Sequence, residues 1–365
     1  MKSYAYIRLP HADTYTAVIQ TDGEPERHIS YEALDGKSGF VVAPFAISEE
    51  CPVLLIRPDI REVRPVPALS AADGAATAAV ANAACDDAAD VRSAYASDFA
   101  GCHKKLLSGA FRKIVLARTS DVLSDRDLSP ETLFLRACHL YPRMCVMLVS
   151  TPVSGTWLAA TPETLLEGGG DSWRTVALAG TMKLEGNALK FDNPPLGDGD
   201  AAASGIVWSS KNIEEQRYVA TFIGNCITRF AGSWAESGPM TVRAANMVHL
   251  RSDFTFTLDD AYHLGRVIAA LHPTPAVCGL PKAETWRHIV MNEHIRRRYY
   301  SGFMGLLEPY GTTSLYVSLR CMEILDERRF RLYAGGGLLK DSDEELEWNE
   351  TETKLDTILK VIEWG

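Results

Sequence analysis

The sequence lacks any apolar run close to the ~20 residues that a membrane-spanning helix needs. Its first ten residues, MKSYAYIRLP, contain neither a long apolar core nor the small-residue cleavage site of a secretory signal. Positive charge is also in short supply, because 37 Lys and Arg face 47 Asp and Glu, for a net charge of -10. Phosphate binding needs concentrated basic side chains, so this balance argues against nucleic acid as a partner. We therefore expect a soluble, cytoplasmic protein that binds neither membrane nor nucleic acid.

Metal-binding and disulfide patterns of cysteine are missing as well. The eight cysteines include no C-x-x-C pair, and no histidine cluster accompanies them. This excludes the common zinc motifs and argues against a disulfide framework. We expect buried, small apolar side chains in a reducing compartment. The eight are Cys51, Cys85, Cys102, Cys138, Cys145, Cys226, Cys278 and Cys321.

What the sequence contains is ordinary globular composition, with 46% hydrophobic and 23% charged residues. A chain of 365 residues can bury a large core without metal or disulfide support. The stretch 68–91 differs, because it is rich in alanine and almost free of large apolar side chains. Such a composition cannot anchor a core and predicts a surface helix or a loose linker.

Strand-like and helix-like patterns mix along the chain without strict alternation. Several strands look hairpin-connected, which favours an α+β fold with largely antiparallel sheets over a doubly wound parallel sheet. The region 3–66 is predicted to be rich in strands, and 193–205 to be a loop. Further strands are expected at 111–118, 144–150, 157–160, 172–179, 302–307, 314–319 and 330–334, and helices at 96–109, around 219–230, and at 258–271, 282–298 and 344–363.

Glu215 is the first candidate functional residue. It precedes Val219 by one helical turn and is in line with the apolar stripe of Val219, Phe222 and Cys226. A carboxylate on a buried helix face is costly unless it is paired or bound to a metal. The alternative is a solvated carboxylate that interacts with the dipole of the first helical turn.

The last predicted helix repeats this pattern. Glu347, Glu350 and Lys354 share one side of it and border an apolar stripe. A solvated acidic helix start is the alternative interpretation. Two helices that each present a partly buried carboxylate could instead hold one Mg²⁺, which takes one or two protein carboxylates and keeps waters.

Lys113 lies in the predicted strand FRKIVLAR (111–118). Alternation places it on the same face as Val115 and Ala117. If the strand is central, Lys113 is buried, and burial favours the neutral amine that can accept a proton. The alternative is a lysine on an edge strand that prevents aggregation.

Two glycine-containing segments and one arginine complete the candidates. AGGG (334–337) and AGT (179–181) each end a predicted strand, where backbone N–H groups can approach an anion closely. Arg320 ends the strand YVSLR and could form a bidentate pair with a carboxylate. Ordinary turns and a surface arginine are the alternatives.

The order of these motifs resembles the chorismate-utilising enzymes, which include isochorismate, salicylate, anthranilate and aminodeoxychorismate synthases. The resemblance begins near Ala94 and covers roughly three quarters of the chain. It implies one chorismate-binding domain over 1–365, with a variable part, 1–93, and a family core, 94–365. It also implies mainly antiparallel sheets packed face to face, with helices around them. The motifs are FRKIVLAR (111–118), ATPETLL (160–166), LAGT (178–181), SKNIEEQ (210–216), VHL (248–250), LHPTPAVCGLP (271–281), YSGFMG (300–305), SLRC (318–321), AGGGLL (334–339) and ELEWNETETK (345–354).

The resemblance also implies a role for each candidate. Glu215 and Glu350, supported by Glu347, are expected to hold Mg²⁺, which binds the ring carboxylate of chorismate. Lys113 is expected to take a proton from the attacking water, and Glu163 to protonate the departing hydroxyl. The expected substrate contacts are Gly180, Thr181, His249 and Ala276 at the ring, Tyr300, Arg320, Gly335 and Gly336 at the enolpyruvyl carboxylate, and Lys354 as a charge-balancing residue.

Two motifs point to one activity within the family. Lys113 occupies the position of the base in members that use water, and LHPTPAVCG is similar to the isochorismate synthases. We therefore expect an isochorismate synthase that acts as a monomer without an obligatory protein partner. A salicylate synthase, an aminating component with a glutamine amidotransferase partner, and a catalytically silent chorismate-binding regulator are the alternatives. SKNIEEQ departs from the family pattern, because Asn212 and Gln216 stand where Asp and His are frequent.

Overall fold

The computed structural model describes residues 2–68, 78–82, 88–183, 206–244 and 247–364. Within them the strands form two sheets, and every described strand pair is antiparallel. Six α-helices accompany the sheets in the described part of the chain. The predicted α+β class with antiparallel sheets is therefore confirmed.

The first sheet has the strand order β15-β8-β19-β18-β10-β9-β1-β2-β6, and β7 also pairs with β8. Its strands are β1 (Ser3–Arg8), β2 (Thr14–Gln20), β6 (Ile60–Pro65), β7 (Val80–Asn82), β8 (Lys113–Ser124), β9 (Cys145–Thr151), β10 (Gly155–Thr161), β15 (Gly279–Leu280), β18 (Cys321–Ile324) and β19 (Arg329–Leu338). Strand β8 lies inside this sheet between β15 and β19, so the interpretation of Lys113 as an edge-strand lysine is wrong.

The second sheet has the strand order β13-β14-β12-β11-β17-β16-β4-β5-β3. Its strands are β3 (Glu26–His28), β4 (Gly39–Ala43), β5 (Val53–Ile56), β11 (Thr164–Gly169), β12 (Ser172–Lys183), β13 (Ala231–Ala244), β14 (Met247–Leu258), β16 (Phe303–Leu307) and β17 (Thr313–Val317). Short 3-10 helices, η1 (Glu32–Leu34) and η4 (Ala261–His263), also occur.

The α-helices differ from the sequence predictions in the last third of the chain. Helix α5 begins only at Leu264, because the residues up to Leu258 belong to β14, and α6 ends at Asn292 rather than at 298. The pairing of β13 with β14 was not predicted, since half of the β13 residues are exposed and the strand shows no apolar pattern. The helices are α2 (Ala88–Leu107), α3 (Pro130–Leu140), α4 (Ser210–Ile227), α5 (Leu264–Leu271), α6 (Lys282–Asn292) and α7 (Glu344–Glu363).

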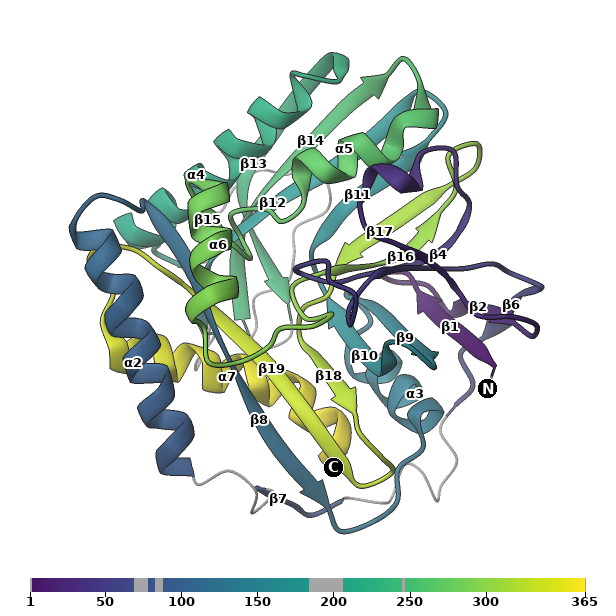
Figure 1. Cartoon of the computed structure of the whole chain (residues 1–365), viewed down its shortest axis with the longest axis horizontal. Helices are drawn as coiled ribbons and strands as arrows, with labels where there is room; N and C mark the ends of the chain where they lie inside the picture. The colour runs from purple at the N-terminus through teal and green to yellow at the C-terminus, as the bar shows by residue number, and fades with distance from the viewer. Residues whose placement is uncertain (1, 69–77, 83–87, 184–205, 245–246, 365) are drawn as a thin grey trace.

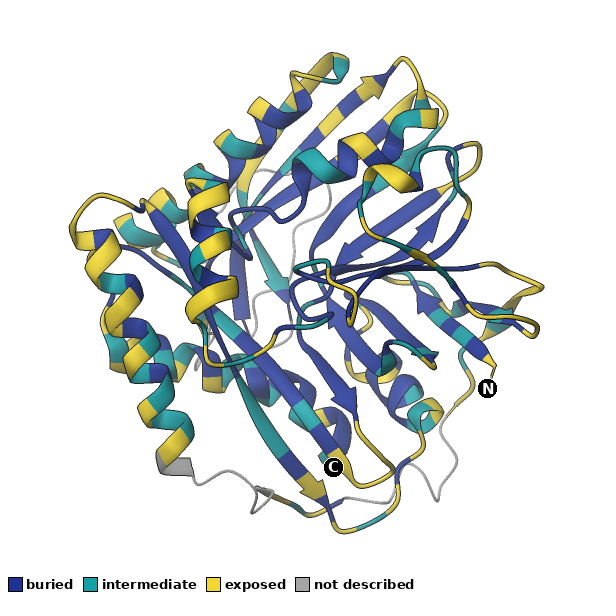
Figure 2. Cartoon of the chain, viewed as in Figure 1, coloured by how far each residue is buried: buried dark blue, intermediate teal, exposed yellow. Residues whose placement is uncertain are grey.

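The two sheets enclose one apolar layer, and the helices cover their outer faces. Side chains of β1, β9 and β10 meet those of β4, β5 and β16 in that layer. Helices α3 and α7 pack on the first sheet, and α4 and α5 on the second. Figure 1 shows α7 along β19 and α4 beside β12, and Figure 2 shows buried strands behind helices whose outer faces are exposed.

Other expectations have mixed outcomes. The seven described cysteines are free and buried, as predicted, while Cys85 lies outside the described residues. Part of the alanine-rich stretch 68–91 is ordered in the fold: Ala78 is buried, β7 pairs with β8, and α2 begins at Ala88. The predicted loop 193–205 lies outside the described residues, and the boundary at residue 93 stays a prediction. No described helix has the length and apolarity to cross a membrane.

Candidate active site

A cavity lies where the two sheets approach each other beside α4 and α7. The space inside it, counted out to the mouth and with open solvent included, is about 650 Å³. Strands β8, β12, β14 and β19 form its walls together with the loops that precede β11, β15, β16 and β18. The lining residues are Val115, Pro162, Glu163, Leu178, Ala179, Gly180, Thr181, Glu215, His249, Ala276, Val277, Tyr300, Leu319, Arg320, Tyr333, Ala334, Gly335, Gly337 and Lys354.

Most of the predicted site residues line this one cavity. They are Glu163, Gly180, Thr181, Glu215, His249, Ala276, Tyr300, Arg320, Gly335 and Lys354. The other four, Lys113, Gly336, Glu347 and Glu350, lie immediately behind its wall, as their contacts with lining residues or with one another show. The structure thus brings together residues that are spread over more than 200 positions of sequence.

Capping positions the two acidic helices. Helix α4 begins after Ser209, whose side chain accepts a hydrogen bond from Asn212 N, and α7 begins after Asp343, which accepts one from Leu346 N. The apolar faces of both helices pack onto the sheets, which fixes their rotation about their axes. As a result Glu215 of α4 and Glu350 of α7 are directed toward the end of β19.

Lys113 is buried and paired with Glu215. Its Nζ lies 2.8 Å from Oε1 of Glu215, but the angles fall outside hydrogen-bond geometry, so Nζ has no hydrogen-bond acceptor among the described residues. Burial raises the pKa of Glu215, yet the charges of Lys113, Lys354 and Lys211 outweigh burial and leave its pKa below the ordinary value. Glu215 is therefore ionised at neutral pH.

Gly337 makes the approach of this pair possible. A Cβ at position 337 would lie 2.2 Å from Oε1 of Glu215 and 3.1 Å from Cε of Lys113. Only glycine leaves room for both side chains beside the strand. Gly335 and Gly336 were predicted as substrate contacts and Gly337 was not, although all three belong to the same AGGG run.

Each of the two α7 carboxylates has its own lysine. Glu350 Oε1 accepts a hydrogen bond of 2.7 Å from Lys354, and Glu347 pairs with Lys211 of α4. Burial, followed by the neighbouring charge of Glu350, raises the pKa of Glu347 despite the opposing charge of Lys211. Lys211 was not predicted as a site residue, although it belongs to the SKNIEEQ motif.

The acidic residues are of the type that binds a divalent cation, but they do not form a complete coordination shell. Among the described residues no group of three or more His, Cys, Asp or Glu side chains is close enough to hold a metal. Glu347 Oε2, however, is buried without a hydrogen-bond partner and lies near Gly336, next to Glu350. Oxygen ligands from two helices suit Mg²⁺, which completes its shell with water or substrate oxygen.

Glu163 enters the cavity from the loop between β10 and β11. Burial raises its pKa from 4.5 to about 8, although the charge of Lys113 opposes this shift. The carboxyl group is thus mostly protonated at neutral pH. A buried neutral acid of this kind can donate a proton, which is the behaviour expected of a general acid.

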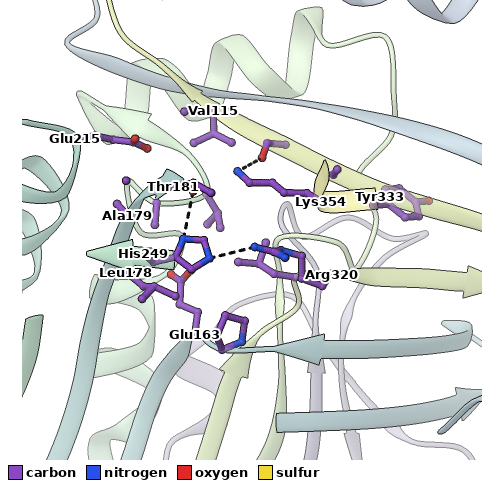
Figure 3. A pocket seen from close by; sticks show the side chains of 18 of the residues that line it. Val115, Glu163, Leu178, Ala179, Thr181, Glu215, His249, Arg320, Tyr333 and Lys354 are labelled. Carbon is purple, nitrogen blue, oxygen red and sulfur yellow. Dashed lines mark hydrogen bonds between the residues drawn. The ribbon is translucent and has the colours of Figure 1, made fainter. Parts of the chain in front are cut away.

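His249 links the ring side of the cavity to Arg320. The Nη2 group of Arg320 lies 3.2 Å from Nε2 of His249, and Nδ1 of His249 lies 3.2 Å from Oγ1 of Thr181 (Figure 3). Burial, and then the charges of Arg320 and Lys354, hold the pKa of His249 well below 6.5. A guanidinium can only donate, so Nε2 accepts and the ring proton of neutral His249 is on Nδ1.

Arg320 is a buried cation with neutral hydrogen-bond partners. Its guanidinium contacts Thr357, Met247 and His249, and no described carboxylate lies within ion-pair distance. Burial lowers its pKa to about 10, so it remains charged at neutral pH. A buried charge without a counter-ion is costly, and an anionic ligand would supply one. The earlier alternative of a surface arginine is wrong.

Tyr300 lines the cavity opposite the glycine run. Its ring stacks on Tyr333 with centroids 5.3 Å apart, and a Cβ at Gly335 would lie 2.7 Å from its hydroxyl. Tyr333 was not predicted, because nothing in the pattern of β19 separates a cavity-facing tyrosine from a core tyrosine. Leu178, Ala179 and Val277 belong to the quoted motifs but were not predicted as substrate contacts, because an apolar side chain that faces a cavity has the same sequence pattern as one in the core.

Comparison with known proteins identifies the family of this chain. The family model for chorismate binding enzymes matches residues 66–363. The chain belongs to the family of chorismate binding enzymes. The solved structure of a putative 2,3-dihydroxybenzoate-specific isochorismate synthase, DhbC, from Bacillus anthracis has the same fold. It aligns with a TM-score of 0.81 at 23% identity over 100% of this chain and 96% of that one.

Two family members are named isochorismate synthases. This chain is 28% identical to isochorismate synthase DhbC of Bacillus subtilis (strain 168), over 71% of this chain and 65% of the relative. It is 27% identical to isochorismate synthase EntC of Escherichia coli (strain K12), over 68% of this chain and 62% of the relative. The chain thus spans less than two thirds of the length of these relatives.

Proposed function

We propose that this protein is an isochorismate synthase, which converts chorismate reversibly to isochorismate with Mg²⁺ as cofactor. The observation that carries the proposal is the burial of Lys113 beside a cavity that also contains the protonated acid Glu163. A base and an acid at one cavity are what exchange of a ring hydroxyl requires. Family members that add ammonia instead of water lack this lysine.

Substrate binding uses the cationic side of the cavity. Chorismate carries two carboxylates, and Arg320 offers a buried guanidinium for the enolpyruvyl carboxylate. Tyr300 and the backbone of Gly335 and Gly336 would complete the contacts with this carboxylate; a Cβ at Gly335 would lie 2.7 Å from the Tyr300 hydroxyl. Thr181 and Ala276 would contact the ring, beside the neutral imidazole of His249.

Mg²⁺ would be held by Glu215 and Glu350, with Glu347 in support. When bound, the ion would neutralise these carboxylates and the ring carboxylate of the substrate. Lys354, which donates to both Glu350 and the carbonyl of Gly335, would keep that side of the cavity in place. The kinship with chorismate binding enzymes supports this role, and a divalent-cation titration tests it.

The proton transfers follow from the two titratable side chains. In its neutral amine form, Lys113 accepts a proton from the attacking water while the water oxygen bonds to the ring carbon next to the carboxylate-bearing one. The double bonds shift, and the hydroxyl across the diene departs with the proton of Glu163 as a new water. One water enters and one leaves, so the net reaction is an isomerisation. A proton returned from Lys113 to Glu163 through solvent restores the site.

Product analysis tests the activity directly. The protein is incubated with chorismate and Mg²⁺, with and without ammonium, and the products are separated by chromatography. Isochorismate that forms only with Mg²⁺ and independently of ammonium is the expected result. Equimolar pyruvate and salicylate would identify a salicylate synthase, ammonium-dependent product would identify an aminating component, and no turnover would favour a silent chorismate-binding protein.

A further inference from the structure

The three acidic residues proposed to hold the cation differ in how firmly their lysines are fixed. Lys113 has an exposed side-chain fraction of 0%, and Lys354, at 14%, donates to both Glu350 and the Gly335 carbonyl. Lys211 is 32% exposed, and Glu347 is its one hydrogen-bond partner among the described residues. Lys211 is therefore the lysine that can leave its carboxylate most easily, because it loses one contact and has a path to solvent.

Glu347 could bind a divalent cation in place of Lys211. Its side chain is almost fully buried, and Oε1 already receives bonds from Lys211 and from Ser342 Oγ at 2.7 Å. Its other oxygen, Oε2, is buried without any hydrogen-bond partner in the described structure. A buried carboxylate oxygen that lacks a donor costs free energy. A divalent cation near Gly336 would remove that cost.

Lys211 also interacts with the other carboxylates of the acidic cluster. Burial lowers the pKa of Lys211, but the charges of Glu347, Glu350 and Glu215 outweigh burial and raise this pKa above its ordinary value. The ammonium thus lies among the carboxylates that would hold Mg²⁺. Two cations cannot both occupy such a cluster without mutual repulsion, which is strong where water is partly excluded.

We propose that Lys211 is a built-in competitor of the divalent cation, pairing with Glu347 until the metal displaces it toward solvent. This inference rests on the proposed function, because it takes the cluster of Glu215, Glu347 and Glu350 as the cation site. The pairing of Lys211 keeps the charge of Glu347 compensated before the metal binds, and the cost of breaking this pair lowers the affinity for Mg²⁺. It also couples metal binding to the first turn of α4, which carries both Lys211 and Glu215.

The competition predicts opposite effects of removing Lys211 on metal affinity and on stability. Without Lys211, Glu347 is a buried carboxylate without a cation, so the metal-free protein becomes less stable. The divalent cation then no longer competes with Lys211 for Glu347, so it binds more tightly. If Lys211 only helped to bind the substrate or to stabilise the helix, its removal would not raise the affinity for the metal.

The test compares wild type, Lys211→Ala, Lys211→Arg and the control Lys360→Ala. Lys360 forms an ion pair with Asp356 within α7, on the outside of the helix and away from the cavity. Mg²⁺ binding is measured by calorimetry and Mn²⁺ binding by electron paramagnetic resonance, both without chorismate. We expect Lys211→Ala to lower the dissociation constant at least about fivefold, the size of one partly exposed ion pair. Lys211→Arg and Lys360→Ala should stay within about twofold of wild type, which is within the scatter of surface substitutions.

Thermal unfolding gives a second readout. Lys211→Ala should melt lower than wild type without metal and should gain more from saturating Mg²⁺ than wild type does. If Lys211→Ala does not fold without metal, Lys211→Gln, which can still donate a hydrogen bond, replaces it in the same titrations.

Unchanged or weaker Mn²⁺ binding by the neutral variants would overturn the inference. If wild type nevertheless forms isochorismate only with Mg²⁺, the proposed function survives and Lys211 alone has been misassigned. If wild type neither binds Mn²⁺ nor requires Mg²⁺ for turnover, the cation site fails together with the inference.

Discussion

Replacing Glu163 by Gln tests the acid at the centre of the mechanism. The substitution keeps the shape of the side chain but removes its titratable proton. Burial holds the pKa of Glu163 at about 8, against an ordinary value of 4.5. Both the pH dependence of stability and the pH dependence of catalysis should therefore depend on this one residue.

The expected size follows from the two pKa values. With a pKa of about 8, roughly nine tenths of Glu163 is protonated at pH 7, compared with about 0.3% at the ordinary value. Between these pKa values the folded protein binds one more proton at this site than the unfolded chain. The free energy of unfolding consequently falls by about 1.4 kcal/mol for each pH unit across that interval. Below it the group costs nothing, and above about pH 8 the full cost is present.

Urea unfolding of wild type and Glu163→Gln at pH 5, 6, 7 and 8 measures this difference. Relative to the variant, wild type should lose about 3.5 kcal/mol between pH 5 and pH 8. Glu49→Gln, at an exposed position, is the matched control and should follow wild type. In parallel, wild-type kcat/KM should decline above about pH 8. The turnover rate of Glu163→Gln should be lower than that of wild type by a factor of roughly 10²–10⁴.

Parallel stability curves for wild type and Glu163→Gln would refute the reasoning. They would show that Glu163 is already ionised in the folded protein at neutral pH. It could then not donate the proton that the departing hydroxyl needs. Retention of near-normal turnover by the Gln variant would refute the assignment independently of any stability measurement.

Further predictions concern the other side of the cavity. Lys113→Ala should lower turnover by about 10²–10⁴, the usual share of a general base, while calorimetry should still detect Mg²⁺-dependent chorismate binding; near-normal turnover would mean that another group is the base. Glu350→Gln should raise the Mg²⁺ concentration needed for half-maximal rate and weaken chorismate binding together, and an unchanged Mg²⁺ dependence would count against its role as ligand. Gly337→Ala would place a methyl group 2.2 Å from Oε1 of Glu215; we expect activity loss and a lower melting temperature, whereas a wild-type profile would show that the Lys113–Glu215 pair can move without consequence.

Several features of the fold and site could be read from local sequence. Alternation along 111–118 correctly placed Lys113 on the face of Val115, because side-chain direction in a strand has a period of two. The helical spacing that put Glu215 in line with Val219 was equally informative, since both side chains turn inward in α4. The antiparallel α+β class followed from the mixture and spacing of such elements.

Other features could not be read in this way, because they depend on which distant segments meet. The pairing of Lys211 with Glu347 joins two helices that lie more than 100 residues apart in sequence. Periodicity predicts the face on which a side chain lies, but not the partner that faces it. Strand β13 was not predicted because it is half exposed and its sequence shows no apolar face.

By itself the sequence determined the residue types, their order and the faces they occupy, because those depend on backbone geometry over a few residues. The tertiary structure decided which charges neutralise one another. It placed Arg320 beside a neutral His249, gave Glu163 a buried site that keeps it protonated, and assigned a separate lysine to each of the three acidic helix residues. Those outcomes depend on burial and on distances of a few ångströms between remote segments, which only the packing of the two sheets and their helices sets.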